Sequence, residues 1–275
     1  MSSIDRKRRR GLCCVFAMGF LSPLMTGATL GRGPGSQQQT SDDAQAQLLP
    51  GANAWRSIPK ELPPGPANDK EKQILEDRGA FFDAGNPYVE PLDQPTPGIG
   101  QGYALCSGPI DLEAPEIPFV PDEAVVVANF ERYQPYLTPS HRYIYTKIIL
   151  TLQQVLESGP SSVQPGQEID LLIHGGTVML NDGRVISFLI RHEDVDFSLQ
   201  PDHRYILFLQ NHRKGDFFTL ERSWELKNGI ALPYSAVDAK RMKEGTSQLA
   251  GLAESDFLEA VRKAIEHDNQ EAFKN

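Results

Sequence analysis

The sequence predicts a mainly β protein, a small antiparallel barrel or sandwich with a C-terminal amphipathic helix and a disordered N-terminal arm. The first observation is PDHRYILFLQ at residues 201–210, an apolar run of strand length that follows a Pro-Asp turn signal. The second is that similar runs, separated by turn residues, recur from about residue 124 to residue 232. The third is the Gly-, Pro-, Gln- and Ser-rich composition of residues 32–120, which buries too little apolar surface to offset the entropy of ordering the chain.

Residues 201–210 are predicted to form a strand that is buried on both faces. Alternate side chains of a strand point to opposite sides, and here neither side is polar. The apolar residues are Tyr205, Leu207 and Leu209 on one side and Ile206 and Phe208 on the other. Such a strand needs a closed barrel, a second sheet or a covering helix around it, and we expect it to be the central strand of a barrel.

The strands before this segment are predicted at residues 124–132 and 142–156. Pro135 and Pro139 between them indicate a long turn, because each proline removes a backbone donor and fixes its own φ. In the second strand, alternate residues from Ile144 to Leu152 form an apolar file, so a period of two fits better than a helical period. The alternation slips at Val155-Leu156, which indicates a bulge or the strand's end.

Further strands are predicted at residues 168–174, 217–222 and 230–232. Asn181-Asp182-Gly183 predicts a hairpin turn between residues 177–180 and 184–191, since Asp-Gly tolerates the positive φ of tight hairpins. We expect residues 184–191 and 217–222 to flank the central strand.

The C-terminal tail, residues 237–275, changes to a helical period. From an N-cap at Ser255 or Asp256, the apolar residues fall on one helical face, and we expect this face to pack on the barrel domain of residues 121–236. They are Phe257, Leu258, Val261, Ala264 and Ile265. A partner-binding helix would show the same pattern.

Residues 1–31 read as a signal peptide: a basic start, RKRRR, an apolar run and then small residues. The apolar run is about 14 residues, shorter than the ~20 needed to span a bilayer, so we expect an exported protein, periplasmic or extracellular, with no stable membrane span after cleavage. Within the arm, Asp69 can cap a short helix near residues 69–79, and Phe81-Phe82 can pin the arm to the folded domain. A loose linker and a docked arm both remain open.

Charge and cysteine content exclude some functions. Without residues 1–28, 22 basic and 35 acidic side chains remain, a net charge of −13, which argues against nucleic acid as a partner. Only Cys106 then remains, so no intrachain disulfide can form. The expected partner is an unidentified protein or glycan in the cell envelope.

The segments VVVANFERY, YIYTKIILTLQQVLESG, VQPGQEIDLLIHGG and LQPDHRYILFLQNHRKGDFFTLER together resemble a group of exported bacterial β-barrel domains of uncharacterised function. More remotely they are similar to the netrin-like module of tissue metalloproteinase inhibitors, which implies an OB-like five-stranded barrel over about residues 122–234. The chain departs from these patterns at Val155–Gly159, which lacks the usual lysine, and at Pro201-Asp202, which replaces Pro-Gly. The module's cysteines are absent apart from Cys106, so protease inhibition is not implied.

The densest polar cluster is HEDVD at residues 192–196, with a further histidine soon after it. Histidine and carboxylate side chains are metal ligands, so the candidate metal site is His192, Asp194, Asp196 and His203. The spacing matches no recognised ligand motif, and a solvated acidic loop is the competing interpretation. No catalytic residues and no cofactor are predicted.

Aromatic residues offer a second possible site, a platform for a sugar ring, although a position in the core or at the barrel's rim explains most of them equally simply. They are Trp55, Trp224, Tyr133, Tyr136, Tyr143 and Tyr145. The sequence therefore predicts an exported, non-enzymatic β-barrel module with a binding or interaction role. The alternatives are a metal-dependent hydrolase that uses the His/Asp cluster and a structural envelope protein.

Overall fold

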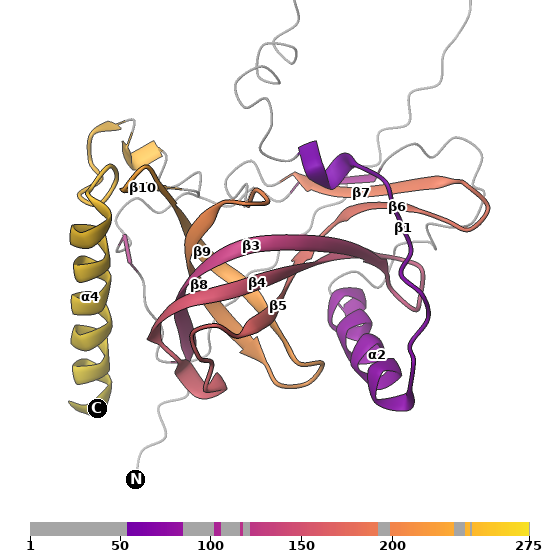
Figure 1. Ribbon diagram of the computed structural model, residues 1–275, viewed down its shortest axis with the longest axis horizontal. Coiled ribbons are helices and arrows are strands. Elements are labelled where there is room, and N and C mark those ends of the chain that lie inside the picture. Colours follow the sequence, from indigo (N-terminus) through magenta and orange to yellow (C-terminus); the bar gives the residue numbers. More distant parts are fainter. Residues whose placement is uncertain are drawn as a thin grey trace, which may run out of the picture.

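The computed structural model shows a β-barrel with two helices that pack at different places on its outer wall (Figure 1). It describes residues 54–84, 102–105, 116–117, 122–191, 199–233, 240–242 and 244–274. Predictions that concern residues 1–31, Cys106 and most of residues 85–121 lie outside these ranges. Among the described residues, no helix combines the length and the apolar character that a membrane crossing requires.

Five strands close the barrel. They are β3 (Glu123–Leu137), β4 (Ile144–Glu157), β5 (Glu168–His174), β8 (Arg204–His212) and β9 (Phe217–Lys227). Their order around the barrel is β3-β4-β5-β9-β8, and β8 pairs with both β3 and β9, which closes the ring. All of these pairings are antiparallel except β5 with β9, which is parallel. The fold class predicted from the sequence, a mainly β chain with an OB-like barrel and a C-terminal helix, is confirmed.

The central strand is β8, and it is buried on both faces as predicted. Tyr205, Leu207 and Leu209 lie in the barrel interior. Ile206 and Phe208 lie in a second cluster outside the barrel wall.

One of the two predicted neighbours of β8 is confirmed and the other is wrong. Residues 217–222 belong to β9, which does pair with β8, but the other neighbour is β3 rather than residues 184–191. Those residues form β7 (Val185–Arg191), which pairs in a hairpin with β6 (Gly176–Met179). The hairpin turn lies where Asn181-Asp182-Gly183 predicts it.

The hairpin belongs to a separate four-stranded sheet in the order β1-β6-β7-β2. Its outer strands, β1 (Lys60–Glu61) and β2 (Gly102–Leu105), come from the N-terminal arm and pair in parallel with β6 and β7. The turn residues predicted the hairpin itself. The addition of β1 and β2 could not be predicted, because the strands that pair lie about a hundred residues apart and no local pattern indicates such pairing.

Strand β3 does not end in a turn at Pro135, as the sequence predicted. It continues to Leu137, and Pro135 pairs opposite Thr146 of β4. Strand β8 pairs with β3 only between Glu123 and Asn129, so the other edge of β3 has no barrel strand beside Pro135. A proline is tolerated at an edge because no ladder partner needs its missing N–H.

The slip in alternation at Val155-Leu156 is a register irregularity between β3 and β4. Val126 pairs with Val155 and Val125 with Glu157, so Leu156 is skipped. An earlier shift, in which Ala128 pairs with Leu152 and Val127 with Gln154, skips Gln153 and turns Val155 into the barrel interior, while Leu156 packs against the outer cluster. A short strand, β10 (Ile230–Pro233), extends the sheet beyond β9.

Helix α4 (Glu254–Lys274) covers the outer face of β8 and β9. Phe257, Leu258, Val261 and Ile265 are buried there, as the helical pattern predicted, and the Phe257 ring lies 4.9 Å from that of Trp224. The helix begins slightly before the predicted cap, because the Ala253 carbonyl already accepts hydrogen bonds from the N–H groups of residues 256 and 257.

Helix α2 (Asp69–Ala84) is longer than the helix predicted near residues 69–79. Gly79 does not end it. A Cβ atom at Gly79 would lie 2.3 Å from Pro139 Cδ, so the glycine permits close packing of the helix against the β3–β4 turn. The glycine at the predicted end of the helix is therefore required for packing.

The described part of the arm is docked on the barrel. Trp55, in the 3-10 helix η1 (Ala54–Ser57), is 6% exposed within the interior cluster. Its Nε1 donates to the Leu199 carbonyl at 2.6 Å, and the Tyr133 hydroxyl donates to the Trp55 carbonyl at 3.0 Å. Phe82 of α2 is 1% exposed in a third cluster, with Tyr143 and Tyr145 of the barrel.

Candidate functional site

The predicted metal cluster is described only at His203. This residue precedes β8, and its Nδ1 lies 2.5 Å from Glu225 Oε1 of β9. His192, Asp194 and Asp196 lie outside the described residues, so their convergence with His203 stays a prediction. Within the described part of the chain, no group of three or more His, Cys, Asp or Glu side chains is placed to hold a metal ion.

The position of His203 follows from the register of β8 and β9, in which Tyr205 pairs opposite Glu225. The Glu225 side chain is 9% exposed, and Lys227 Nζ lies 3.9 Å from its Oε1. A buried carboxylate needs such partners, because an unpaired buried charge is strongly unfavourable. His203 and Glu225 thus form a hydrogen-bonded pair that stabilises the barrel wall.

Aromatic residues proposed for a sugar platform fall into two groups. Trp55, Trp224 and Tyr143 are buried in the core clusters, and Tyr133 packs against Trp55 with ring centroids 4.4 Å apart. Tyr136 and Tyr145, in contrast, line a pocket. Of the six aromatic residues, these two tyrosines are the ones that line this pocket.

Helix α2 covers part of the outer face of β4 and β5, the second and third strands of the barrel. OB barrels often use the corresponding face to bind ligands. Here Arg78 of α2 forms an ion pair with Asp170 of β5 at 2.9 Å, and its guanidinium also donates to the carbonyls of Gly215 and Asp216. The helix is therefore anchored over this face.

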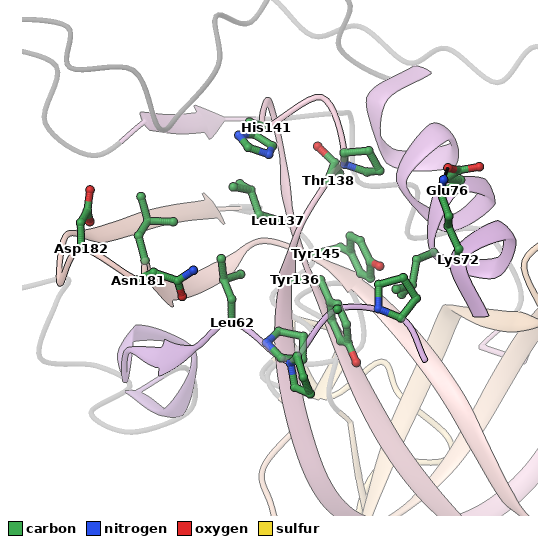
Figure 2. A pocket seen from close by; sticks show the side chains of 17 residues that line it. Leu62, Lys72, Glu76, Tyr136, Leu137, Thr138, His141, Tyr145, Asn181 and Asp182 are labelled. Carbon is green, nitrogen blue, oxygen red and sulfur yellow. Dashed lines mark ion pairs between the residues drawn. The ribbon is translucent and has the colours of Figure 1, made fainter. Parts of the chain in front are cut away.

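A pocket of about 600 Å³ lies beside this helix (Figure 2), and we call it the α2 pocket. The pocket is open on one side and is lined by residues 62–66 of the arm, by Lys72, Leu75 and Glu76 of α2, by the end of β3 with its turn into β4 and the first residues of β4, and by residues 180–182 at the β6–β7 turn. Segments far apart in the sequence thus build one cavity, and its size is typical of small-molecule sites.

The two tyrosines of the pocket are placed by the β3–β4 register, which sets Tyr136 directly opposite Tyr145. Their rings stack with centroids 5.3 Å apart and planes at 5°. The other face of Tyr145 stacks on Phe82 of α2, at 4.9 Å and 4°. Stacking on both sides fixes the Tyr145 ring, so its hydroxyl has a defined position.

The Tyr145 side chain is 1% exposed, yet no described residue forms a hydrogen bond with its hydroxyl, and the same is true of Tyr136. Figure 2 shows the Tyr145 hydroxyl on the side of the pocket that faces α2. Burial raises the pKa of both tyrosines above the ordinary value, and the neighbouring Arg78 opposes this rise in each case. Both hydroxyls therefore stay protonated at neutral pH and are available as donors.

The charged groups at the rim of the pocket are paired. Lys72 Nζ lies 3.9 Å from Glu76 Oε1 along α2, and Arg184 Nε lies 2.7 Å from Asp182 Oδ2 beside the hairpin turn. Hydrogen bonds from Arg184, backbone first and then side chain, lower the pKa of Asp182. Four leucines and four prolines supply the apolar walls, and the prolines, Pro63, Pro64, Pro66 and Pro139, carry no N–H donor.

Sequence reasoning did not predict this pocket. It proposed the tyrosines as a group but had no means to separate Tyr136 and Tyr145 from those in the core, and it assigned residues 62–66 to a disordered arm. The one usable signal was Phe81-Phe82, which indicated possible docking of the arm. No protein-family model matches the chain, and a comparison with curated proteins finds no match.

Proposed function

We propose that this protein is an exported, non-enzymatic binding module whose ligand site is the α2 pocket. The observation that carries the proposal is the Tyr145 hydroxyl, a polar group in a 1% exposed side chain that lines the cavity without a hydrogen-bond partner among the described residues. The hydroxyl oxygen is not among the fully buried side-chain atoms that lack a partner, so it is the part of Tyr145 that opens to the pocket, where water or a ligand satisfies it.

A role in binding is also supported by the chemistry of the described lining residues. They include no serine or cysteine. The hydroxyl of Thr138 is held by Asp83 at 2.9 Å, and Thr138 itself is fully buried. His141 also lines the pocket, but the Thr138 hydroxyl is buried and engaged by Asp83, so it is not presented to a ligand as a nucleophile.

Export is supported by residues 1–31, in which a basic segment, an apolar run and small residues follow one another. A binding module in the cell envelope needs only its pocket and no cofactor. The proposed partner is therefore a molecule of the cell envelope, small enough to enter the pocket or presenting a group that does.

The test is to fill the pocket and measure the loss of binding. Gly65 lines the pocket, has no neighbour within 4 Å of a Cβ atom and does not have a positive φ, so Gly65→Trp adds bulk without strain. Ala67→Trp is the matched control, because Ala67 is exposed in the same segment but does not line the pocket. Phenol and 2-propanol serve as probes in ¹H–¹⁵N NMR titrations of the purified protein.

We expect saturable shift changes at residues of the pocket in the unmodified protein and in Ala67→Trp, and their loss in Gly65→Trp. Thermal unfolding of both variants checks that the fold is intact. The proposal is wrong if the probes cause no localised changes at the pocket, or if they bind Gly65→Trp as they bind the unmodified protein.

A further inference from the structure

The α2 pocket also carries information about the chemical class of its ligand, and this inference rests on the proposed function. The first relevant feature is hydrogen bonding. Tyr145 and Tyr136 offer two hydroxyl donors that no described residue uses, while the four prolines in the wall offer no backbone N–H. Each hydroxyl can donate its proton to an acceptor atom of a ligand, and each phenol oxygen can also accept a hydrogen bond.

The second feature is charge. Lys72 is paired with Glu76 and Asp182 with Arg184, so neither side of the rim presents an unbalanced charge from these residues. An ionic ligand would lose part of its hydration beside the apolar walls, and the nearest opposite charges already have partners in these exposed pairs. Burial of a charge without a free partner is strongly unfavourable, so the pocket favours a neutral molecule.

The third feature is the shape of the apolar surface. Tyr145 is held between Phe82 and Tyr136, so it contributes its edge and hydroxyl rather than an open ring face. Stacking of a sugar ring on Tyr145 is thereby blocked. Leu62, Leu75, Leu137 and Leu180 supply aliphatic walls on several sides of the cavity.

From these three features we infer that the α2 pocket takes a neutral, largely apolar molecule that carries a carbonyl acceptor, such as an amide or ester, with the acceptor oxygen bound by the Tyr145 hydroxyl. Ionic ligands and sugars fit the same cavity less well. A hydrocarbon of the same size would pack against the apolar walls but would offer no hydrogen-bond acceptor to the hydroxyl.

A matched series of probes tests this class. Benzamide, toluene, benzoate and benzylammonium share one ring and differ in charge and acceptor, and their dissociation constants are measured by ¹H–¹⁵N NMR titration of the full chain. We expect benzamide to bind best, toluene about fivefold more weakly for the missing hydrogen bond, and the two ions at least about tenfold more weakly.

Tyr145→Phe removes the hydroxyl and keeps the ring. This substitution is expected to weaken the binding of benzamide about fivefold and to leave the affinity for toluene unchanged. Tyr133→Phe is the control, since its hydroxyl bonds to Trp55 away from the pocket; it lowers thermal stability but not benzamide affinity.

The outcomes separate this inference from the proposed function. If benzoate, benzylammonium or toluene binds the pocket as tightly as benzamide, or if Tyr145→Phe does not weaken benzamide, the ligand class is wrong while the pocket remains a binding site. If phenol and 2-propanol bind the pocket but none of the four probes does, the ligand class is again wrong. If no probe of either set binds, both proposals are wrong.

Discussion

At the scale of single residues, Tyr145 links the fold to the proposed site. It belongs to the β4 strand, stacks on rings from β3 and α2, and lines the pocket with its hydroxyl. Burial of this residue raises its pKa above the ordinary value of 10.0. The folded chain therefore keeps the phenol protonated at pH values where the unfolded chain ionises it.

This difference predicts a loss of stability in alkali. A group whose folded-state pKa is raised contributes fully below its unfolded pKa, and the contribution is lost as the pH rises from about 10 toward the folded value. For one such tyrosine the loss is about 1.4 kcal/mol per pH unit. Urea unfolding at pH 8, 10 and 11 measures it, and Tyr145→Phe should show a smaller fall in the free energy of unfolding above pH 10. An identical fall in both proteins would contradict the assigned burial.

At the scale of elements, α2 is placed by one glycine as much as by its apolar residues. Gly79 lies mid-helix, where a glycine is unfavourable by about 1 kcal/mol relative to alanine. In an isolated helix, Gly79→Ala would therefore increase the stability of the helix. Here the new Cβ would lie 2.3 Å from the Pro139 ring, which is covalently stiff, so α2 must shift away from the β3–β4 turn.

We expect Gly79→Ala to lower the free energy of unfolding by about 1–3 kcal/mol, the usual effect of overpacking. Gly65→Ala is the matched control: it has open space and no positive φ, and a small gain of about 0.4–1 kcal/mol is expected from the unfolded state. Denaturant unfolding of the two variants measures both effects. A stabilised Gly79→Ala would show that α2 does not pack on Pro139.

Elements with a strong local pattern were predicted well. The β8 strand carries apolar residues on both faces, and β5 occupies residues 168–174 as predicted, because these patterns depend only on the strand itself. The turn predicted at Pro135 was wrong, because a proline interrupts a strand only where a neighbouring strand needs its N–H group. The pairing of β8 with β3 and the addition of β1 and β2 to the hairpin depend on contacts distant in sequence, which local patterns do not record.

At the scale of the whole molecule, the arm and the barrel form one unit. Trp55 packs in the barrel interior and Phe82 against its outer wall, while residues 62–66 between them enclose the pocket. Low apolar content led us to predict that residues 62–66 are disordered, but the two aromatic anchors on either side hold them in place. The composition of an arm predicts its own stability and not its docking.

The most direct test of a site built jointly by arm and barrel is limited proteolysis of the purified full chain, followed by mass analysis of the resistant core. The docked arm predicts a core that begins upstream of Ala54 and retains α2. Trp55→Ala, which empties a buried aromatic position and is expected to be unfavourable by about 3–5 kcal/mol, should make residues 54–84 readily cleaved. A stable core of the unmodified protein that begins near Pro121 would contradict the docked arm, and with it the pocket that the arm encloses.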